Sequence, residues 1–402
     1  MTLIGAGLTH HQPVTGAGFA AKPKGTTRTP TVPKPLAEAF AGLPDPRVDR
    51  GKKHSLADVL SIALCAVIAG ADSWEEVERF AEARHDWLKR FLPLPNGVPS
   101  HDTFYRLFSR LDPARFAECV TGWLAGACEA TGLRHVAVDG KSVRASPKGT
   151  FSGCLHLVSA WAAENRLILG QVSVGDGSHE IAAVPELLRV LDLKGALVTL
   201  DAAGCQKGIA RQVRAGGGDY LLAVKGNQPA LSKAVRAAFD RACGADLEGV
   251  AHDGHASAED GHGRREERYT TVIYDPADLP PEWPDVAAVV LVGREREAGG
   301  RNASTAHYYV TSHRGSAEEL GRLVRRHWAI ENELHWCLDV SFREDESRTS
   351  AGHAGANLGL VRRVAASLIK QDKGKGSVKA KRMTAAWDES YLLKLLQGTT
   401  AD

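Results

Sequence analysis

The 402-residue chain lacks three features that mark other protein classes. Its seven cysteines are scattered and form no Cys-x-x-Cys pair, so neither a zinc site nor a redox motif is indicated and a reduced, cytoplasmic setting is expected. No basic segment followed by an apolar run opens the sequence, so a secretory signal is not expected. The longest apolar stretch, Val59 to Ala71, is shorter than the roughly 20 residues of a membrane span and predicts a buried helix.

The net charge is also small, +2 with an isoelectric point near 8.1, so bulk electrostatics neither requires nor excludes a nucleic-acid partner. Local basic clusters suit phosphate contacts, although each also fits a solvated face or a flexible tail. They comprise Lys22, Lys24, Arg28 and Lys34 near the start, Arg322, Arg325 and Arg326 before Glu331, and Lys370, Lys373, Lys375, Lys379, Lys381 and Arg382 near the end.

The pattern along the chain changes from helical to short β-rich runs with helices between them, which predicts an α/β fold with a partly parallel sheet. Serines at 55, 73 and 100 are expected to cap helices in the first region. Two of these helices fit either a helix-turn-helix reader of DNA or, as we favour, scaffold. The expected segments are a disordered arm (1–35), an N-terminal helical domain with a DNA-binding alternative (36–130), the first part of a catalytic core (131–225), a β-rich insertion (226–316), the C-terminal core helices (317–370) and a basic tether with a short terminal helix (371–402).

Three acidic residues stand out by their local context. Asp139 and Asp201 each follow an apolar run that predicts a strand, and Glu331 lies in a long predicted helix. An aspartate at a strand end faces the crevice where α/β proteins bind ligands, although each is also an ordinary turn signal by itself. Three carboxylates delivered this way can converge on two divalent metal ions, as in enzymes of phosphoryl transfer.

The helix around Glu331 carries an unusual polar face. Positions four apart stack on one side of a helix, so His327, Glu331 and His335 are expected to align, with Trp328 and Trp336 beside them. This ladder fits a transition-metal site or histidines that hydrogen-bond inside the domain. The tryptophans fit base stacking or, as we favour, core packing.

The motifs together resemble the ISAs-type DDE transposases of bacterial insertion sequences, which include the H-repeat-associated proteins. The resemblance runs from about residue 35 to residue 396. Its motifs are Leu43-Pro-Asp-Pro-Arg47, Trp74-Glu-Glu, Val138-Asp-Gly-Lys-Ser142, Leu200-Asp-Ala-Ala-Gly-Cys-Gln-Lys207, Gly218-Asp-Tyr-Leu-Leu-Ala-Val-Lys-Gly-Asn-Gln228, His327-Trp-Ala-Ile-Glu-Asn-Glu-Leu-His-Trp-Cys-Leu-Asp-Val340 and Phe342-Arg-Glu-Asp345.

The resemblance implies an RNase H-like catalytic domain with a β-rich insertion, preceded by a small helical domain, in which Asp139, Asp201 and Glu331 match the metal-binding triad. The expected activity is cleavage of DNA at transposon ends and strand transfer into target DNA. Two Mg²⁺ ions per site are expected, with Mn²⁺ as a substitute. The expected partners are double-stranded DNA, as terminal inverted repeats and target, and further copies of the chain; no membrane is expected.

The expected DNA contacts come from side chains near the triad. Lys141 and Arg144 would steady a phosphate, and the turn at Lys225 fits a phosphate cradle or a plain strand-ending turn. The full set is Lys141, Arg144, Lys207, Lys225, Asn227, Arg325, Arg326, His327, Trp328, Asn332, His335 and Trp336.

The sequence also departs from related transposases. A Tyr, Arg and Lys that accompany the glutamate in those proteins are replaced by Val324, His327 and Leu338, and Arg326 is a candidate substitute for the arginine. The related Lys-Ser-Asn-Glu-Ile stretch is here Gly177-Ser-His-Glu-Ile181, which puts a lysine contact to DNA in doubt. Two alternatives remain open: a domesticated DNA-binding regulator that does not cut, and a nuclease without strand transfer.

Overall fold

The computed structural model describes residues 40–125, 134–145, 154–175, 180–261, 264–298 and 301–397. The expected disordered arm and the first basic cluster lie outside these residues. No helix in the described ranges is long and apolar enough to cross a lipid bilayer. The predicted buried helix at Val59 to Ala71 is confirmed as part of α2 (Leu56–Ile68), whose side chains from Val59 onward are at most 3% exposed.

The first described region is helical. Ser55 caps α2 and Ser73 caps α3, each by accepting a bond from the amide three residues later, as expected. Ser100 precedes α5 but its side chain caps nothing; the first amide of that helix, from His101, donates instead to Glu78. The elements here are η1 (Asp49–Gly51), α2, α3 (Trp74–Ala83), α4 (His85–Leu88), α5 (His101–Arg110) and α6 (Pro113–Ala125).

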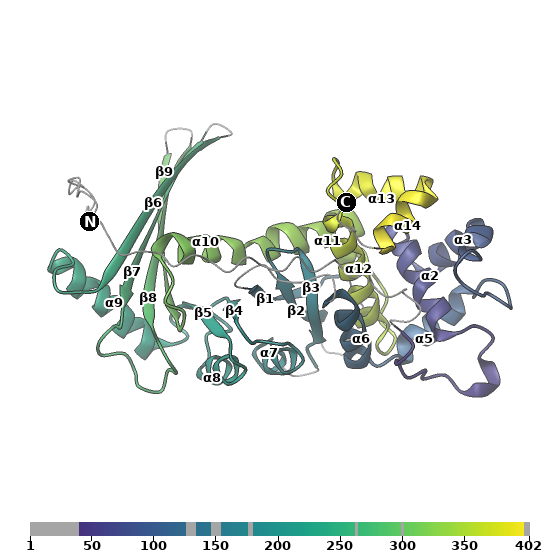
Figure 1. Cartoon of the computed structure of the whole chain (residues 1–402), viewed down its shortest axis with the longest axis horizontal. Coiled ribbons are helices and arrows are strands. Elements are labelled where there is room, and N and C mark those ends of the chain that lie inside the picture. Colours follow the sequence, from purple (N-terminus) through teal and green to yellow (C-terminus); the bar gives the residue numbers. More distant parts are fainter. Residues whose placement is uncertain are drawn as a thin grey trace, which may run out of the picture. The chain divides into compact units, whose positions relative to one another are not determined.

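The described strands form one nine-stranded sheet in the order β3-β2-β1-β4-β5-β9-β8-β7-β6 (Figure 1). β1 runs parallel to β4, and β4 runs parallel to β5. β2 pairs antiparallel with β1 on one side and with β3 on the other. This half of the sheet has the order and directions of an RNase H-like fold, as expected. The strand bounds are β1 (Arg134–Val143), β2 (Leu155–Ala162), β3 (Leu167–Ser173), β4 (Ala196–Leu200), β5 (Asp219–Val224), β6 (His252–Gly261), β7 (Arg264–Tyr274), β8 (Ala288–Ala298) and β9 (Arg301–Thr311).

The insertion continues the same sheet, because β9 pairs antiparallel with β5. The insertion is β-rich, as expected, but it opens with a helix that was not expected, α9 (Pro229–Gly244), which has Pro229 in its first turn and buries Val235 and Phe239. A proline is well placed there because the first helical amides have no partner inside the helix. The strand β6 is also absent from the sequence-based prediction, since its residues, His252 to Gly261, are mostly polar.

Helices cover both faces of the sheet (Figure 1). Side chains alternate along a strand, so Val136 and Val138 of β1 face the core beneath α7, whereas Ala137 faces the core shared with the C-terminal helices. That second core also contains α2, α3 and α5, which therefore pack with the C-terminal helices as one unit. The remaining elements are α7 (Glu180–Arg189), α8 (Lys207–Ala215), α10 (Ala317–His327), η2 (Ile330–His335), α11 (Trp336–Phe342), η3 (Glu344–Glu346), α12 (Ala354–Gln371), α13 (Val378–Trp387) and α14 (Glu389–Gln397).

The expected basic tether near the C-terminus is wrong. α12 extends through Lys370, and α13 begins at Val378, so only a short loop separates the two helices. Lys381 and Arg382 are buried rather than solvated; Lys381 pairs with Asp372 at 3.2 Å, and Arg382 lies over the ring of Phe342. These cations stabilise the packing of the last helices and are not free to contact phosphates.

Candidate active site

Two of the three acidic residues lie at adjacent positions of neighbouring strands. The parallel pairing of β1 with β4 ends at Val138 and Leu200, and the next residue on each side is Asp139 or Asp201. Neighbouring strands lie about 4.8 Å apart, so the two aspartates lie side by side where the parallel pairing ends, at its carboxyl end. The expectation that Asp139 ends its strand is wrong in one respect, because β1 continues to Val143 through its pairing with β2.

Glu331 reaches the same region from a helix with unusual geometry. It lies in η2, a π-helix that follows α10 after a short break, and its side chain is exposed. A π-helical turn is wider than an α-helical one and often occurs at functional sites. It also breaks the expected four-residue ladder: His335 is buried toward the sheet while Glu331 is exposed. The idea of a separate His-Glu-His metal site is therefore not supported.

The electrostatics of Asp139 connect the three acids. Its pKa is raised to about 7, first by burial and then by the negative charges around it. Those charges come from Glu180, Glu331 and Asp201, in decreasing order of effect. Among the residues that the structure describes, no three His, Cys, Asp or Glu side chains lie close enough to hold one ion as they stand. The charges of Glu331 and Asp201 nevertheless act on Asp139, so the three acids are electrostatically coupled.

Glu180 is a charge that sequence reasoning missed. It is the first residue of α7, and its Oε2 lies 3.4 Å from Nε2 of His156 on β2. Both side chains lie against Gly140, the residue after Asp139: a Cβ atom added there would come within 2.5 Å of each. The signal available in the sequence was the Glu-Ile pair at residues 180 and 181, which the chain shares with related transposases where it lacks their lysine.

The two histidines near Glu331 are structural in their contacts. His335 is only 9% exposed, and its Nδ1 lies 3.5 Å from Oδ2 of Asp139. Burial lowers the pKa of His335 to about 3, so the imidazole is neutral and the contact is not an ion pair. His327 shares the hydroxyl of Thr199 with His135, at 2.9 Å on each side. Both histidines thus contact groups of the protein here, and their contact with DNA stays a prediction.

The two cations expected to hold a phosphate beside Asp139 contact carboxylates instead. Lys141 is 7% exposed, and its Nζ lies 2.7 Å from Asp339 and 2.9 Å from Asp345. Arg144 also pairs with Asp345, at 3.3 Å, but its side chain is 84% exposed. Of these two cations, Arg144 is therefore the accessible one. The acidic motif that ends at Asp345 gives no sign, in the sequence alone, that it supplies a partner for Lys141.

The turn at Lys225 packs against the loop that follows Asp201. The side-chain amide of Asn227 donates to the carbonyl of Ala202 at 2.6 Å, which holds the turn beside the acidic edge. Lys225 and Asn227 are both exposed, and Asn227 has this structural contact. Lys207, at the start of α8, donates to Glu282 of the insertion.

Three further expected DNA contacts, Arg325, Arg326 and Asn332, lie on α10 and η2. Arg325 forms a bidentate pair with Glu259 at 2.6 and 3.0 Å, and Arg326 pairs with Glu164 at 3.0 Å. Asn332 is exposed and donates to the carbonyl of Trp328 at 3.0 Å. These pairs lie at the surface, where such interactions exchange readily with other charged groups.

Both tryptophans are exposed, so the favoured expectation that they pack in the core is wrong. Trp328 is 44% exposed and Trp336 is 62% exposed. Trp328 lines a pocket of about 610 Å³ between η2 and the insertion, together with Arg268, Arg294 and His307. An aromatic ring beside two arginines suits contact with DNA.

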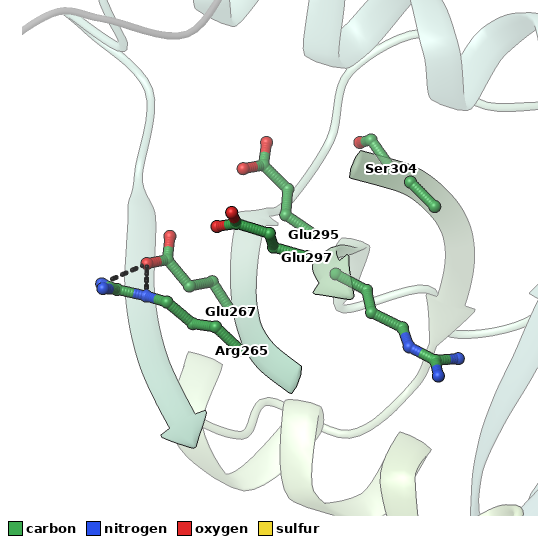
Figure 2. Close-up of a pocket in the computed structure, with 7 residues that line it drawn as sticks. Arg265, Glu267, Glu295, Glu297 and Ser304 are labelled. Carbon is green, nitrogen blue, oxygen red and sulfur yellow. Dashed lines mark hydrogen bonds and ion pairs between the residues drawn. The ribbon is translucent and has the colours of Figure 1, made fainter. Parts of the chain in front are cut away.

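A second pocket, of about 430 Å³, lies among charged side chains of β7, β8 and β9 (Figure 2). Arg265 and Glu267 on one wall form an ion pair at 2.7 Å, and Glu295 and Glu297 project from the neighbouring strand. The strands that form it lie on the insertion side of β5, whereas Asp139 lies in β1 on the other side. This pocket is separate from the acidic site.

Comparison with known proteins identifies the family. A model described as a transposase DDE domain matches residues 130–367, and a model for its associated region matches residues 37–124. YhhI of Escherichia coli K12, named as an H repeat-associated candidate transposase, is 37% identical over 91% of this chain and 98% of its own length. An uncharacterized protein in the dhlA 3′ region of Xanthobacter autotrophicus is 43% identical over 70% of this chain and 94% of its own.

Among solved structures, a piggyBac transposase synaptic complex with hairpin DNA covers 92% of this chain and 79% of its own, with 11% identity and a TM-score of 0.37, a likeness too low to support an argument. The family assignment rests on the sequence matches, which extend over most of the chain; the range 130–367 spans the positions of all three acidic residues. The chain belongs to the transposase DDE domain family.

Proposed function

We propose that this protein cuts DNA at the ends of its own insertion sequence and joins those ends to target DNA. One observation carries the proposal: Asp139 and Asp201 leave adjacent strands side by side, and the charge of Glu331 acts on Asp139. A buried carboxyl surrounded by like charges is costly unless a cation neutralises them. The donor set suits a hard cation, because Mg²⁺ prefers carboxylate oxygens.

Asp139, Asp201 and Glu331 are the residues that would hold Mg²⁺, with Mn²⁺ as a substitute. When bound, such ions lower the pKa of a water molecule or hydroxyl and stabilise the oxygen that leaves phosphorus. The chain's own part is to bring the carboxylates together and to orient Asp139, whose Oδ2 lies against the neutral ring of His335. Arg144, Lys225, Trp328 and Trp336 are the exposed candidates for holding DNA around them.

The reaction we propose has two steps at one site. Water first attacks the phosphodiester at the transposon end, the bond to the 3′ oxygen breaks, and a 3′-OH is released. That 3′-OH then attacks a phosphodiester of the target, which forms the new bond and displaces the target's own 3′ oxygen. The joining step requires transposon ends and target DNA to be held together, so we propose that the protein acts as a homo-oligomer on DNA in the bacterial cytoplasm.

The decisive experiment uses a labelled DNA end taken from the inverted repeat beside the gene. The purified protein is incubated with this DNA and an unlabelled target, with Mg²⁺ or with EDTA. Nicks and joined products that need Mg²⁺ support the transposase. Nicks without joining support a nuclease, and binding without nicks supports a regulator that does not cut.

Matched variants connect the activity to the site. Glu331→Gln removes one candidate ligand, and Glu318→Gln removes an exposed carboxylate of α10 that has no part in the proposal. Loss of one ligand from a site that works by charge neutralisation is expected to slow cleavage by at least about 10²-fold. Equal activity of the two variants would contradict the assignment of Glu331.

A further inference from the structure

The contacts of Lys141 differ from those of a phosphate-binding lysine. Lys141 lies two positions after Asp139 on β1, so both side chains project from the same face of the sheet. Its ammonium group is enclosed by carboxylates: Nζ lies 2.7 Å from Oδ1 of Asp339, 2.9 Å from Oδ1 of Asp345 and 3.9 Å from Oε2 of Glu344. The side chain is only 7% exposed, so a DNA phosphate has little access to it.

A second cation, Arg363, pairs with one of the three carboxylates near Lys141. Glu344 and Arg363 are both fully buried, and Nη1 of Arg363 lies 2.6 Å from Oε1 of Glu344. The guanidinium of Arg363 therefore neutralises the carboxylate of Glu344. Asp339 and Asp345 remain as the main partners of Lys141. An ammonium between two carboxylates in a nearly closed site is held far more firmly than an exposed ion pair.

The partners of Lys141 belong to the segment that carries Glu331. Asp339 lies in α11, which continues directly from the π-helix η2. Between Glu331 and Asp339, His335 contacts Asp139. Farther along the chain, the carbonyl of Asp345 accepts a bond from the amide of Ala145 at 3.0 Å. The strand that carries Asp139 and the segment that carries Glu331 are thus joined by several successive contacts.

We propose that Lys141 is a positioning residue that fixes the helix bearing Glu331 against the strand bearing Asp139. This inference rests on the proposed function, because it assumes that the two acids act together. Lys141 touches neither DNA nor the reacting atoms. Its role is to set the separation of two carboxylates across the site through its bonds to Asp339 and Asp345, and displacement of a reacting group by about 1 Å costs on the order of 10²-fold in rate.

The two roles for Lys141 predict different kinetics. If Lys141 binds a DNA phosphate, Lys141→Met weakens DNA binding and reduces the dependence of affinity on salt by about one ion. If Lys141 positions the helix, the same variant keeps affinity and salt dependence within about twofold of the wild type, cleaves about 10²-fold more slowly in a single turnover, and needs more Mg²⁺ for half-maximal rate. Lys194→Met, at an exposed lysine before β4, is the matched control.

The test measures single-turnover cleavage, its Mg²⁺ dependence and DNA affinity at several salt concentrations for the wild type, Lys141→Met and Lys194→Met. Asp339→Asn, whose carboxylate is 34% exposed, provides a second variant if Lys141→Met does not fold, and it is expected to show the same kinetic pattern. A loss of affinity and salt dependence in Lys141→Met would overturn the proposal. So would a loss of thermal stability with unchanged rate and Mg²⁺ requirement, which indicates a purely structural lysine.

The double variant Lys141→Met/Asp339→Asn gives an internal check, because two residues that act through one interaction should not have additive effects on rate. Additive losses would contradict the proposal. A wild type that does not cut DNA with Mg²⁺ would overturn the proposed function and this inference together. If the wild type cuts DNA and Lys141→Met cuts it at the same rate, this inference alone would be overturned.

Discussion

Nδ1 of His335 lies 3.5 Å from Oδ2 of Asp139, with both groups largely buried. The two pKa values are displaced in opposite directions, to about 3 for His335 and about 7 for Asp139. Burial is the first cause in each case, because it disfavours whichever form is charged. Around neutral pH the ring is therefore uncharged, and Asp139 gains little from it to offset the negative charges nearby. A bound cation would neutralise this excess of negative charge.

The raised pKa of Asp139 predicts a specific dependence of stability on pH. The folded protein keeps a proton on this carboxyl up to about pH 7, whereas the unfolded chain loses it near 3.8. The folded state binds more protons over that interval, so the contribution of Asp139 to stability falls as pH rises from about 4 to about 7. Asp139→Asn removes this contribution.

The measurement is the urea midpoint at pH 5 and at pH 8 without divalent ions. Asp139→Asn is expected to gain stability over the wild type at pH 8 and much less at pH 5. Glu186→Gln, at an exposed position of α7, serves as the control with no pH-dependent difference from the wild type. A constant difference between Asp139→Asn and the wild type across this range would contradict the buried, charge-crowded environment of Asp139.

A side chain at Gly140 is predicted to displace two neighbouring side chains. A Cβ atom there would lie 2.5 Å from Cδ of Glu180 and 2.5 Å from Nε2 of His156. Gly140→Ala must therefore displace the ends of these two side chains. Because both side chains are partly exposed and can shift, the expected cost is about 0.5–1 kcal/mol in the free energy of unfolding. Gly208→Ala, in α8, meets nothing within 4 Å and is expected to stabilise its helix by about 0.5–1 kcal/mol. Chemical denaturation of both variants checks the contrast, and similar values would count against the close approach of Glu180.

Arg363 and Arg325 offer a comparison between a buried and an exposed ion pair. Arg363→Met leaves Glu344 without its partner at a fully buried position, and the expected loss is about 3–5 kcal/mol. Arg325→Met leaves Glu259, which is 52% exposed, and the expected loss is below about 1 kcal/mol. Denaturant titrations decide the matter. A small loss for Arg363→Met would show that water reaches Glu344 in the folded protein.

The sequence predicted the parts of this molecule that have strong local signals. Apolar runs located β1, β4 and β5, and the serines at 55 and 73 marked where helices begin. The RNase H-like core followed from the resemblance. The strand β6 and the helix α9 were missed because a polar strand at a sheet edge and a helix inside a polar segment have weak periodicity.

The site was predicted less completely than the fold. Asp139, Asp201 and Glu331 were chosen from local context, and their roles remain predictions. The contacts of Lys141 and His335 were misjudged, since charge in the sequence does not reveal a partner distant along the chain. The π-helix at Ile330 to His335 brings different side chains to face the sheet than the expected α-helix would, and no sequence pattern predicted it. Glu180 was overlooked although the Glu-Ile pair at residues 180 and 181 is shared with related transposases, because its proximity to Asp139 is created only by folding.

Anomalous diffraction from crystals soaked in Mn²⁺ tests the central claim most directly, because it locates bound ions independently of activity. The account predicts Mn²⁺ peaks within about 2.0–2.3 Å of carboxylate oxygens of Asp139, Asp201 and Glu331. The same crystals of Asp139→Asn should show these peaks weakened or lost. Clear Mn²⁺ peaks elsewhere on the protein, with the three carboxylates empty and apart, would contradict the claim that these residues form one metal site.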